Sequence, residues 1–245
     1  MTTDISRKRS IPVAVVIAVL AMIAALVATA AGEPSANADS QGHSATDTVA
    51  AAPAHQMSEP PRGLHPAKLA FHDQMRKLWE DHITWTRLAI VTFFDGSAGF
   101  DATAARLLQN QTDIGDAIKP FFGDGAGNQL TALLNDHITI AVELLQAAKA
   151  GNQEQIEDAS NRWYANANDI ADFLAAANPK HWPQETMRAA MKTHLDQTLA
   201  EALHELNGDY AASVADYEEI HRHILEMADL LSNGIIRAFP DHFRG

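Results

Sequence analysis

Residues 66–95 read PAKLAFHDQMRKLWEDHITWTRLAIVTFFD, and their pattern predicts a helical fold. Their large apolar side chains recur every three or four residues, which is the period of one helix face. Pro66 suits the first turn of a helix, and Asp95-Gly96 suits its end. We therefore expect one long helix, with one stripe made of Met75, Leu78, Trp79, His82, Thr86, Ala89 and Phe93.

The same period continues to the end of the chain, and no run of alternating β-branched residues interrupts it. Four further long helices are expected at about 126–149, 152–178, 183–207 and 209–237. A segment at about 101–119 is expected to be short and broken, because Pro120 follows it. Since the connections are short, sequential long helices should be antiparallel. The pattern predicts an all-α domain over 65–245, an antiparallel helical bundle of four to five long helices plus a short broken helix.

Composition excludes several classes of protein. The chain has 245 residues and a net charge of -13, from 18 basic and 31 acidic side chains. A nucleic-acid binder needs a cationic surface, so nucleic acid is not an expected partner. The chain has no cysteine, which excludes disulfides, thiolate metal ligands and a cysteine nucleophile.

The N-terminus has the pattern of a membrane signal, and a hydrophobic helix is expected there. Arg7, Lys8 and Arg9 precede the uncharged run 11–31, whose helical length of roughly 30 Å matches a bilayer core. Residues 1–31 are thus a signal anchor, or a signal peptide cleaved near Ala38. Residues 32–64 read as a flexible linker. Either alternative places the bundle outside the cytoplasm, membrane-anchored or secreted.

Each long apolar stripe contains a polar residue near the middle of its helix. These residues are His82, His137, Asn166, His194 and His221. The midpoints of antiparallel helices lie at one level, so the five could form one buried layer. An unpaired buried polar group costs about 1–3 kcal/mol, so such a layer needs mutual partners, water or a metal.

Two interpretations of this layer remain open. His82, His137 and His194, with His221 or Asn166 as a fourth group, suit a divalent metal such as Zn, Cu, Fe or Mn. Alternatively the histidines are hydrogen-bonded core residues with no ligand.

Other polar residues would orient the layer rather than bind the metal. Glu201 follows His194 by seven residues, or roughly 10.5 Å along a helix axis, so the two cannot easily share an ion. Thr198 lies one turn from His194 and could orient its imidazole. Arg87 should pair with a carboxylate such as Asp169, or hold an anionic ligand.

Known catalytic motifs fit poorly. Glu201-x-x-His204 and Glu218-x-x-His221 resemble half of a di-iron site, but the two further glutamates such a site needs are missing from the apolar stripes. The zinc-protease, nucleophile-elbow, P-loop and dinucleotide motifs are absent from the sequence. No catalytic residue is assigned, and an enzyme is not the favoured interpretation.

Several runs resemble a family of small bacterial helical proteins, common in Gram-positive soil bacteria, that has no established activity. They include Leu78-Trp79-x-x-His82-x-x-Trp85-Thr86-Arg87, Arg162-Trp163-Tyr164-x-Asn166 and His194-Leu195-x-x-Thr198-x-x-Glu201-Ala202. Some members carry an acetylglutamate-kinase label, but this chain lacks the α/β pattern that such a kinase needs. The resemblance covers about 70–240. It implies a helical bundle and points to His82, His137 and His194, without implying a reaction.

The leading hypothesis is an exported, membrane-tethered binding protein that holds a metal ion or a small polar ligand at the histidine layer. The alternative is a non-enzymatic cell-envelope interaction module whose histidines are structural. The N-terminal helix would contact the membrane. A protein partner is possible, but the sequence does not identify one. A metal-dependent hydrolase or oxidase is the least favoured hypothesis, because the sequence shows no open coordination position or cleft.

Overall fold

The computed structural model describes residues 66–244, so the expected N-terminal helix and linker lie outside the described residues. The part described is helical, with no strand. Its elements are α2 (Pro66–Phe94), α3 (Phe100–Phe122), α4 (Asp124–Ala150), α5 (Gln153–Ala177), α6 (Gln184–Asn207), α7 (Tyr210–Ala238) and the 3-10 helix η1 (Pro240–Phe243). The prediction of an all-α bundle is confirmed. Among residues 66–244, no helix has an apolar stretch long enough to cross a membrane.

The segment expected to be short and broken is a continuous helix. It forms α3, which has 23 residues and contains Pro120. Proline removes the donor to the carbonyl four residues earlier, here that of Asp116, but only two residues of the helix follow Pro120, so little of α3 lies beyond the missing bond. The helix ends at Gly123, whose N–H donates to the carbonyl of Lys119 at 2.9 Å. The bundle therefore has six long helices, where four to five plus a short one were expected.

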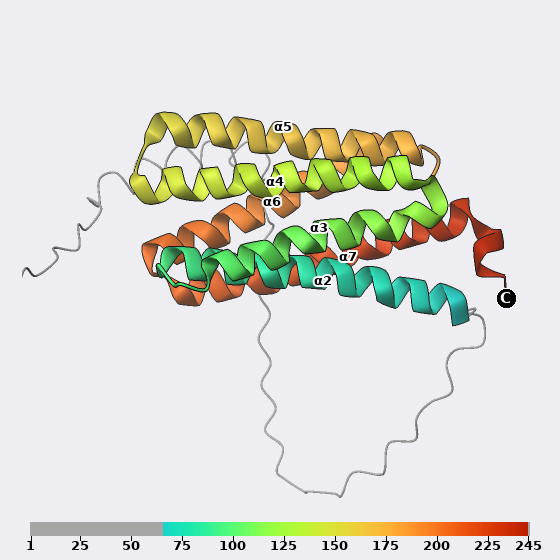
Figure 1. Ribbon diagram of the computed structural model, residues 1–245, viewed down its shortest axis with the longest axis horizontal. Coiled ribbons are helices and arrows are strands. Elements are labelled where there is room, and N and C mark those ends of the chain that lie inside the picture. Colours follow the sequence, from blue (N-terminus) through green and yellow to red (C-terminus); the bar gives the residue numbers. More distant parts are fainter. Residues whose placement is uncertain (1–65, 245) are drawn as a thin grey trace, which may run out of the picture.

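The helices pack in chain order, and the last returns to the first. Each of α2 to α7 packs against the next helix along the chain, and α7 also packs against α2. Figure 1 shows α4 and α5 on one side and α2, α3 and α7 on the other. Helix α6 crosses obliquely between the two groups, and contacts α2 as well as α5 and α7. The interior side chains of α2, α4 and α6 can therefore meet.

Capping side chains and glycines define several helix ends at the positions that the sequence predicts. The side chain of Asn152 accepts a hydrogen bond from the N–H of Gln155 at 3.2 Å, and Asp209 caps α7 through Ala212 in the same way. Gly151 and Gly208 end α4 and α6 with φ of 65° and 75°. L-residues rarely adopt this left-handed conformation, so glycine is favoured at both ends.

A glycine pair sets the close approach of α3 and α4. A Cβ added at Gly115 would lie 2.6 Å from the carbonyl oxygen of Gly127, and one at Gly127 would lie 2.6 Å from that of Gly115. Neither position has room for a side chain. This contact fixes α3 against α4, and so helps to set the position of the polar residues on α3.

Candidate functional site: a cavity lined by three histidines

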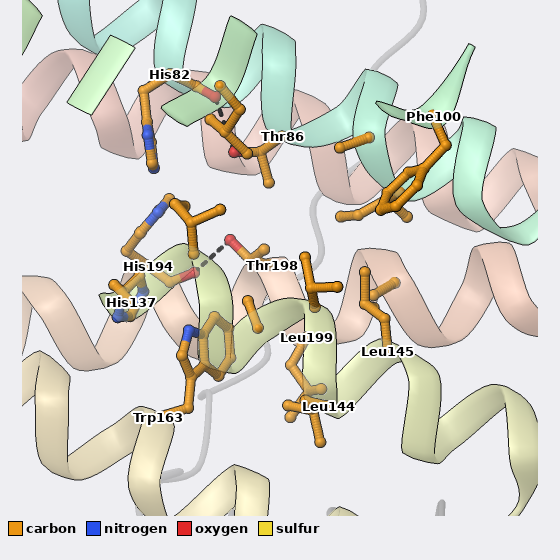
Figure 2. A pocket seen from close by; sticks show the side chains of 17 residues that line it. His82, Thr86, Phe100, His137, Leu144, Leu145, Trp163, His194, Thr198 and Leu199 are labelled. Atoms are coloured by element: carbon orange, nitrogen blue, oxygen red, sulfur yellow. Dashed lines mark hydrogen bonds between the residues drawn. The ribbon is translucent and has the colours of Figure 1, made fainter. Parts of the chain in front are cut away.

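His82, His137 and His194 line one cavity in the middle of the bundle. They come from α2, α4 and α6, and each side chain is buried. The cavity has a volume of about 60 Å³, counted as the space that the centres of water molecules can occupy. One water molecule needs roughly 10–15 Å³ of this volume. In Figure 2 the rings of His82 and His194 point toward one another, and their centroids lie 5.6 Å apart. The cavity therefore has room for several waters or a small molecule.

His137 is held by an amide on α5. Its Nδ1 lies 2.7 Å from Oδ1 of Asn166, and Nδ2 of Asn166 donates to the carbonyl of Leu133 at 3.1 Å. The amide oxygen is thus the acceptor, and Nδ1 of His137 is the donor. The indole of Trp163 stacks on the imidazole, with centroids 5.2 Å apart and planes at 24°. These contacts fix the orientation of the ring.

His82 is held by an amide on α3. Nε2 of Gln111 lies 3.3 Å from Nδ1 of His82 and donates to the carbonyl of Leu107 at 2.7 Å. Gln111 is fully buried, and it was not among the site residues expected from the sequence. The signal was present: Gln111 lies four residues after Leu107 and three before Ile114, on the buried face of α3.

His194 has no amide partner. Its Nδ1 is buried and makes no hydrogen bond. Thr198, which was expected to orient this imidazole, donates instead to the backbone carbonyl of His194 at 2.8 Å. Thr86 makes the equivalent bond to the carbonyl of His82, also at 2.8 Å. Both threonines line the cavity, but their hydroxyl protons are used within their own helices.

The three imidazoles are uncharged near neutral pH. Burial, and then the proximity of His137, lower the pKa of His82 to about 4. Burial also lowers the pKa of His137 to about 4, against the opposing effect of Asn166. Burial is again the main cause for His194, whose pKa lies well below its ordinary value, with smaller effects from its neighbouring histidines. An imidazole here acts as a neutral hydrogen-bonding group or metal ligand.

The remainder of the wall is apolar, and one end is less buried than the histidine end. Leu107, Ile138 and Leu144 are buried, whereas Phe100 and Leu145 are half-buried. Figure 2 places Phe100 and Leu145 away from the three histidines. The cavity thus has a polar inner end and an apolar outer end. No lysine, arginine, aspartate or glutamate lines it.

Unsatisfied polar atoms gather around this cavity. Residues 66–244 contain six fully buried side-chain nitrogen or oxygen atoms without a hydrogen-bond partner. Two of them, Nε1 of Trp163 and Nδ1 of His194, belong to side chains that line the cavity. Two more belong to Gln111 and Trp79, which both contact His82. Such atoms are rare in folded proteins, so their concentration marks the site as unusual.

His221 and Asp169, both expected site residues, lie away from the cavity. His221 does not join the layer: it is partly exposed on α7, where its Nε2 lies 2.9 Å from Oε1 of Glu80. Ile220 and Ile224 occupy the inward face of α7, so His221 lies on its outward face. Asp169 lies in a separate groove, lined by Phe122 of α3 and by side chains of α4 and α5 such as Leu133.

Glu201 and Arg87 form a buried ion pair rather than part of the cavity wall. Arg87 was expected to pair with Asp169 or a ligand, but its guanidinium donates to Glu201 and to the hydroxyl of Ser213. That hydroxyl in turn donates to Glu205 at 2.8 Å. Burial raises the pKa of Glu201 to about 7, although Arg87 opposes this effect. The cluster holds two buried carboxyl groups against a single guanidinium.

The donors present do not form a ready-made metal site. Within the described range, no group of three or more histidine, aspartate or glutamate side chains is arranged to hold a metal ion. A cation at the three histidines would need side-chain movement. The site can offer hydrogen bonds from uncharged imidazoles, within an apolar enclosure. No family model, curated protein or solved structure matches the chain, so its function is inferred from this geometry.

Proposed function

We propose that this chain is a binding protein that holds a small polar ligand or a metal ion in the cavity formed by His82, His137 and His194. The observation that carries the proposal is three uncharged imidazoles from three helices on the wall of one cavity. Packing alone would fill this space with aliphatic side chains, because burying partly satisfied polar groups lowers stability. A ligand that uses these groups would account for their presence.

The supporting amides favour binding over a purely structural role. His137 is positioned by Asn166, and His82 by Gln111. Partners of this kind orient imidazoles in ligand and metal sites. His194, in contrast, keeps a buried nitrogen without a partner. A set of core histidines that only stabilised the fold would be expected to satisfy one another.

The N-terminal sequence supports an extracytoplasmic location. We propose that the run 11–31, behind the basic cluster 7–9, directs export and either anchors the chain or is removed near Ala38. The bundle would then sample ligands outside the cytoplasm.

Analysis of bound species tests the proposal. Full-length protein, purified without a histidine tag, would be compared with its His137→Ala variant by elemental analysis and native mass spectrometry. His221→Gln is the matched control, since it changes a histidine outside the cavity. We expect a metal or small molecule on the wild type and the control, and its loss from His137→Ala with helix content retained. Equal occupancy in all three proteins would contradict the proposal.

A second experiment, a titration with added ligands, tests for a site that loses its ligand during purification. Thermal unfolding would be followed with added Zn²⁺, Cu²⁺, Mn²⁺ or Fe²⁺ and with small uncharged polar molecules. Ligands that bind only the folded state raise its melting temperature. Failure of every added species to raise it would favour the alternative, an envelope interaction module with structural histidines.

A further inference from the structure

Amide side chains hold two of the three cavity histidines from outside the cavity. Asn166 contacts Nδ1 of His137, and Gln111 contacts Nδ1 of His82. Neither amide lines the cavity wall, whereas both histidines do. Because Nδ1 of each ring faces an amide, Nε2 is the nitrogen that each ring can offer to a ligand.

Both rings can present a lone pair to a cation while their N–H group stays hydrogen-bonded. A cation at Nε2 leaves the proton on Nδ1, wherever that proton lies before binding. For His137 the acceptor is Oδ1 of Asn166 at 2.7 Å. For His82, burial lowers the pKa, and a side-chain hydrogen bond with Asn110 opposes this effect. Such opposition is the effect of an amide oxygen that accepts from the ring.

His194 is the one cavity histidine that no partner holds. Its Nδ1 is buried and, within residues 66–244, has no hydrogen-bond partner. Its ring points toward that of His82, with centroids 5.6 Å apart (Figure 2). A cation shared by three histidines requires side-chain movement, because no three donors of residues 66–244 are already arranged around one point. His194 can supply this movement, since turning its ring breaks no hydrogen bond.

The charge and size of the cavity favour one class of cation. No carboxylate lines its wall, so a bound ion has no anionic partner there. The cost of moving an ion into apolar surroundings rises with the square of its charge, which favours a monovalent ion over a divalent one. Na⁺ and K⁺ prefer oxygen ligands, whereas imidazole suits copper. Cu⁺ accepts two or three ligands, and the volume of about 60 Å³ has room for a single ion.

We propose that this cavity binds one monovalent copper ion, Cu⁺, through Nε2 of His82, Nε2 of His137 and a ring nitrogen of His194. This inference rests on the proposed function and names its ligand. His82 and His137 are preformed ligands, and His194 turns to complete a three-coordinate site. The apolar remainder of the wall keeps water from the ion.

Anaerobic titration of the full-length chain, without a histidine tag, tests the proposal. Cu⁺, kept reduced with ascorbate, would be compared with Zn²⁺, each in competition with a chelator of known affinity. We expect one Cu⁺ per chain, bound at least about a hundredfold more tightly than Zn²⁺. Binding of Zn²⁺ or of an uncharged molecule at the histidines in place of Cu⁺ would overturn the copper assignment but keep the proposed function. Failure of every added species to bind would overturn both.

Variants link the copper to the cavity. His194→Phe removes the ligand that completes the site and should weaken Cu⁺ binding at least about tenfold. His221→Gln changes a histidine outside the cavity and should bind as the wild type does. Equal affinity of His194→Phe and the wild type for Cu⁺ would overturn the assignment of copper to this site.

Spectroscopy of the wild type decides the ligands even if a variant fails to fold. Cu⁺ is diamagnetic, so imidazole ¹⁵N spectra remain observable in the complex. We expect nitrogen resonances of His82, His137 and His194 to shift and those of His221 to stay. X-ray absorption should show a shell of nitrogen neighbours only, at about 2 Å from the copper. Sulfur neighbours, or shifts confined to other histidines, would overturn the proposal.

Asn166 is a positioning residue in this site, because it orients His137 without touching the ion. Asn166→Leu removes the acceptor for the imidazole N–H and should weaken Cu⁺ binding by about 10–100-fold. Asn166→Asp keeps an acceptor and should retain most of the affinity, which distinguishes positioning from general loss of packing. Equal affinity of Asn166→Leu and the wild type would overturn this role.

Discussion

At the scale of single residues, the histidines link the stability of the fold to pH. A histidine in an unfolded chain has a pKa of about 6.5, whereas the pKa of His82 and of His137 in the fold is about 4. Above pH 6.5 both states are uncharged, and the histidines cause no pH dependence. Between pH 6.5 and 4 the unfolded chain binds protons that the fold excludes, so stability falls as pH falls.

We therefore predict that acidification from pH 6.5 to 4 destabilises the protein, by on the order of 3 kcal/mol for each of these two histidines. Denaturant unfolding at several pH values measures the effect. Glu201 acts in the opposite sense, because its pKa is raised to about 7 in the fold. A His137→Gln variant isolates the histidine contribution and should show a shallower pH dependence. Parallel profiles for the variant and the wild type would contradict the prediction.

The buried ion pair gives a second prediction at this scale. Arg87→Met should destabilise the fold by about 3–5 kcal/mol at pH 8, since it leaves the carboxylate of Glu201 buried without its cation. Adding Glu201→Gln removes the uncompensated charge, so the double variant should recover part of the loss. Urea unfolding of the wild type, both single variants and the double variant measures the coupling. A double variant no more stable than Arg87→Met would argue against charge as the cause.

At the scale of helices, the contact between α3 and α4 depends on two glycines. Gly115→Ala should cost about 1–3 kcal/mol, because its Cβ would lie 2.0 Å from Oγ1 of Thr131 and 2.6 Å from the carbonyl oxygen of Gly127. Gly125→Ala is the matched control in α4, since its Cβ would meet nothing within 4 Å. The control should be neutral or slightly stabilising. Equal effects of both changes on the melting temperature would contradict this account of the contact.

The helices themselves were predictable because their signals are local. Caps such as Asn152 and Asp209, and the glycines that follow α4 and α6, mark boundaries through contacts within a few residues. Helix α3 was underestimated for a related reason. Pro120 was expected to end the helix, but it lies only two residues before Phe122, the last residue of α3, and interrupts one backbone hydrogen bond there.

The candidate site was only partly predictable, because side-chain partners depend on how helices pack. Helical spacing placed His82, His137 and His194 on buried faces, where the structure has them. It could not show that α7 turns His221 outward, or that Arg87 reaches Glu201 instead of Asp169. Gln111 was missed because the segment that forms α3 was expected to be short and broken, so its buried face was not traced.

At the scale of the whole molecule, α6 crosses between the other helices (Figure 1), and its residues His194, Thr198 and Leu199 lie on the cavity wall. Filling the cavity should remove binding while the fold persists. Ala141 lies on the cavity wall one turn after His137, so Ala141→Leu projects new volume into the space. We predict loss of the bound species with a stability change within about 1 kcal/mol. Ala148→Leu, on the same helix but outside the cavity, should bind as the wild type does, and unchanged binding by Ala141→Leu would contradict the assignment.

Imidazole ¹⁵N NMR of the full chain at pH 7 is the decisive measurement, recorded with and without the added species that raises the melting temperature. We predict that His82, His137 and His194 are uncharged, and that their side-chain nitrogen resonances shift when this species is added while that of His221 does not. Charged imidazoles, or cavity resonances that the added species leaves unchanged, would contradict a ligand site at these three histidines.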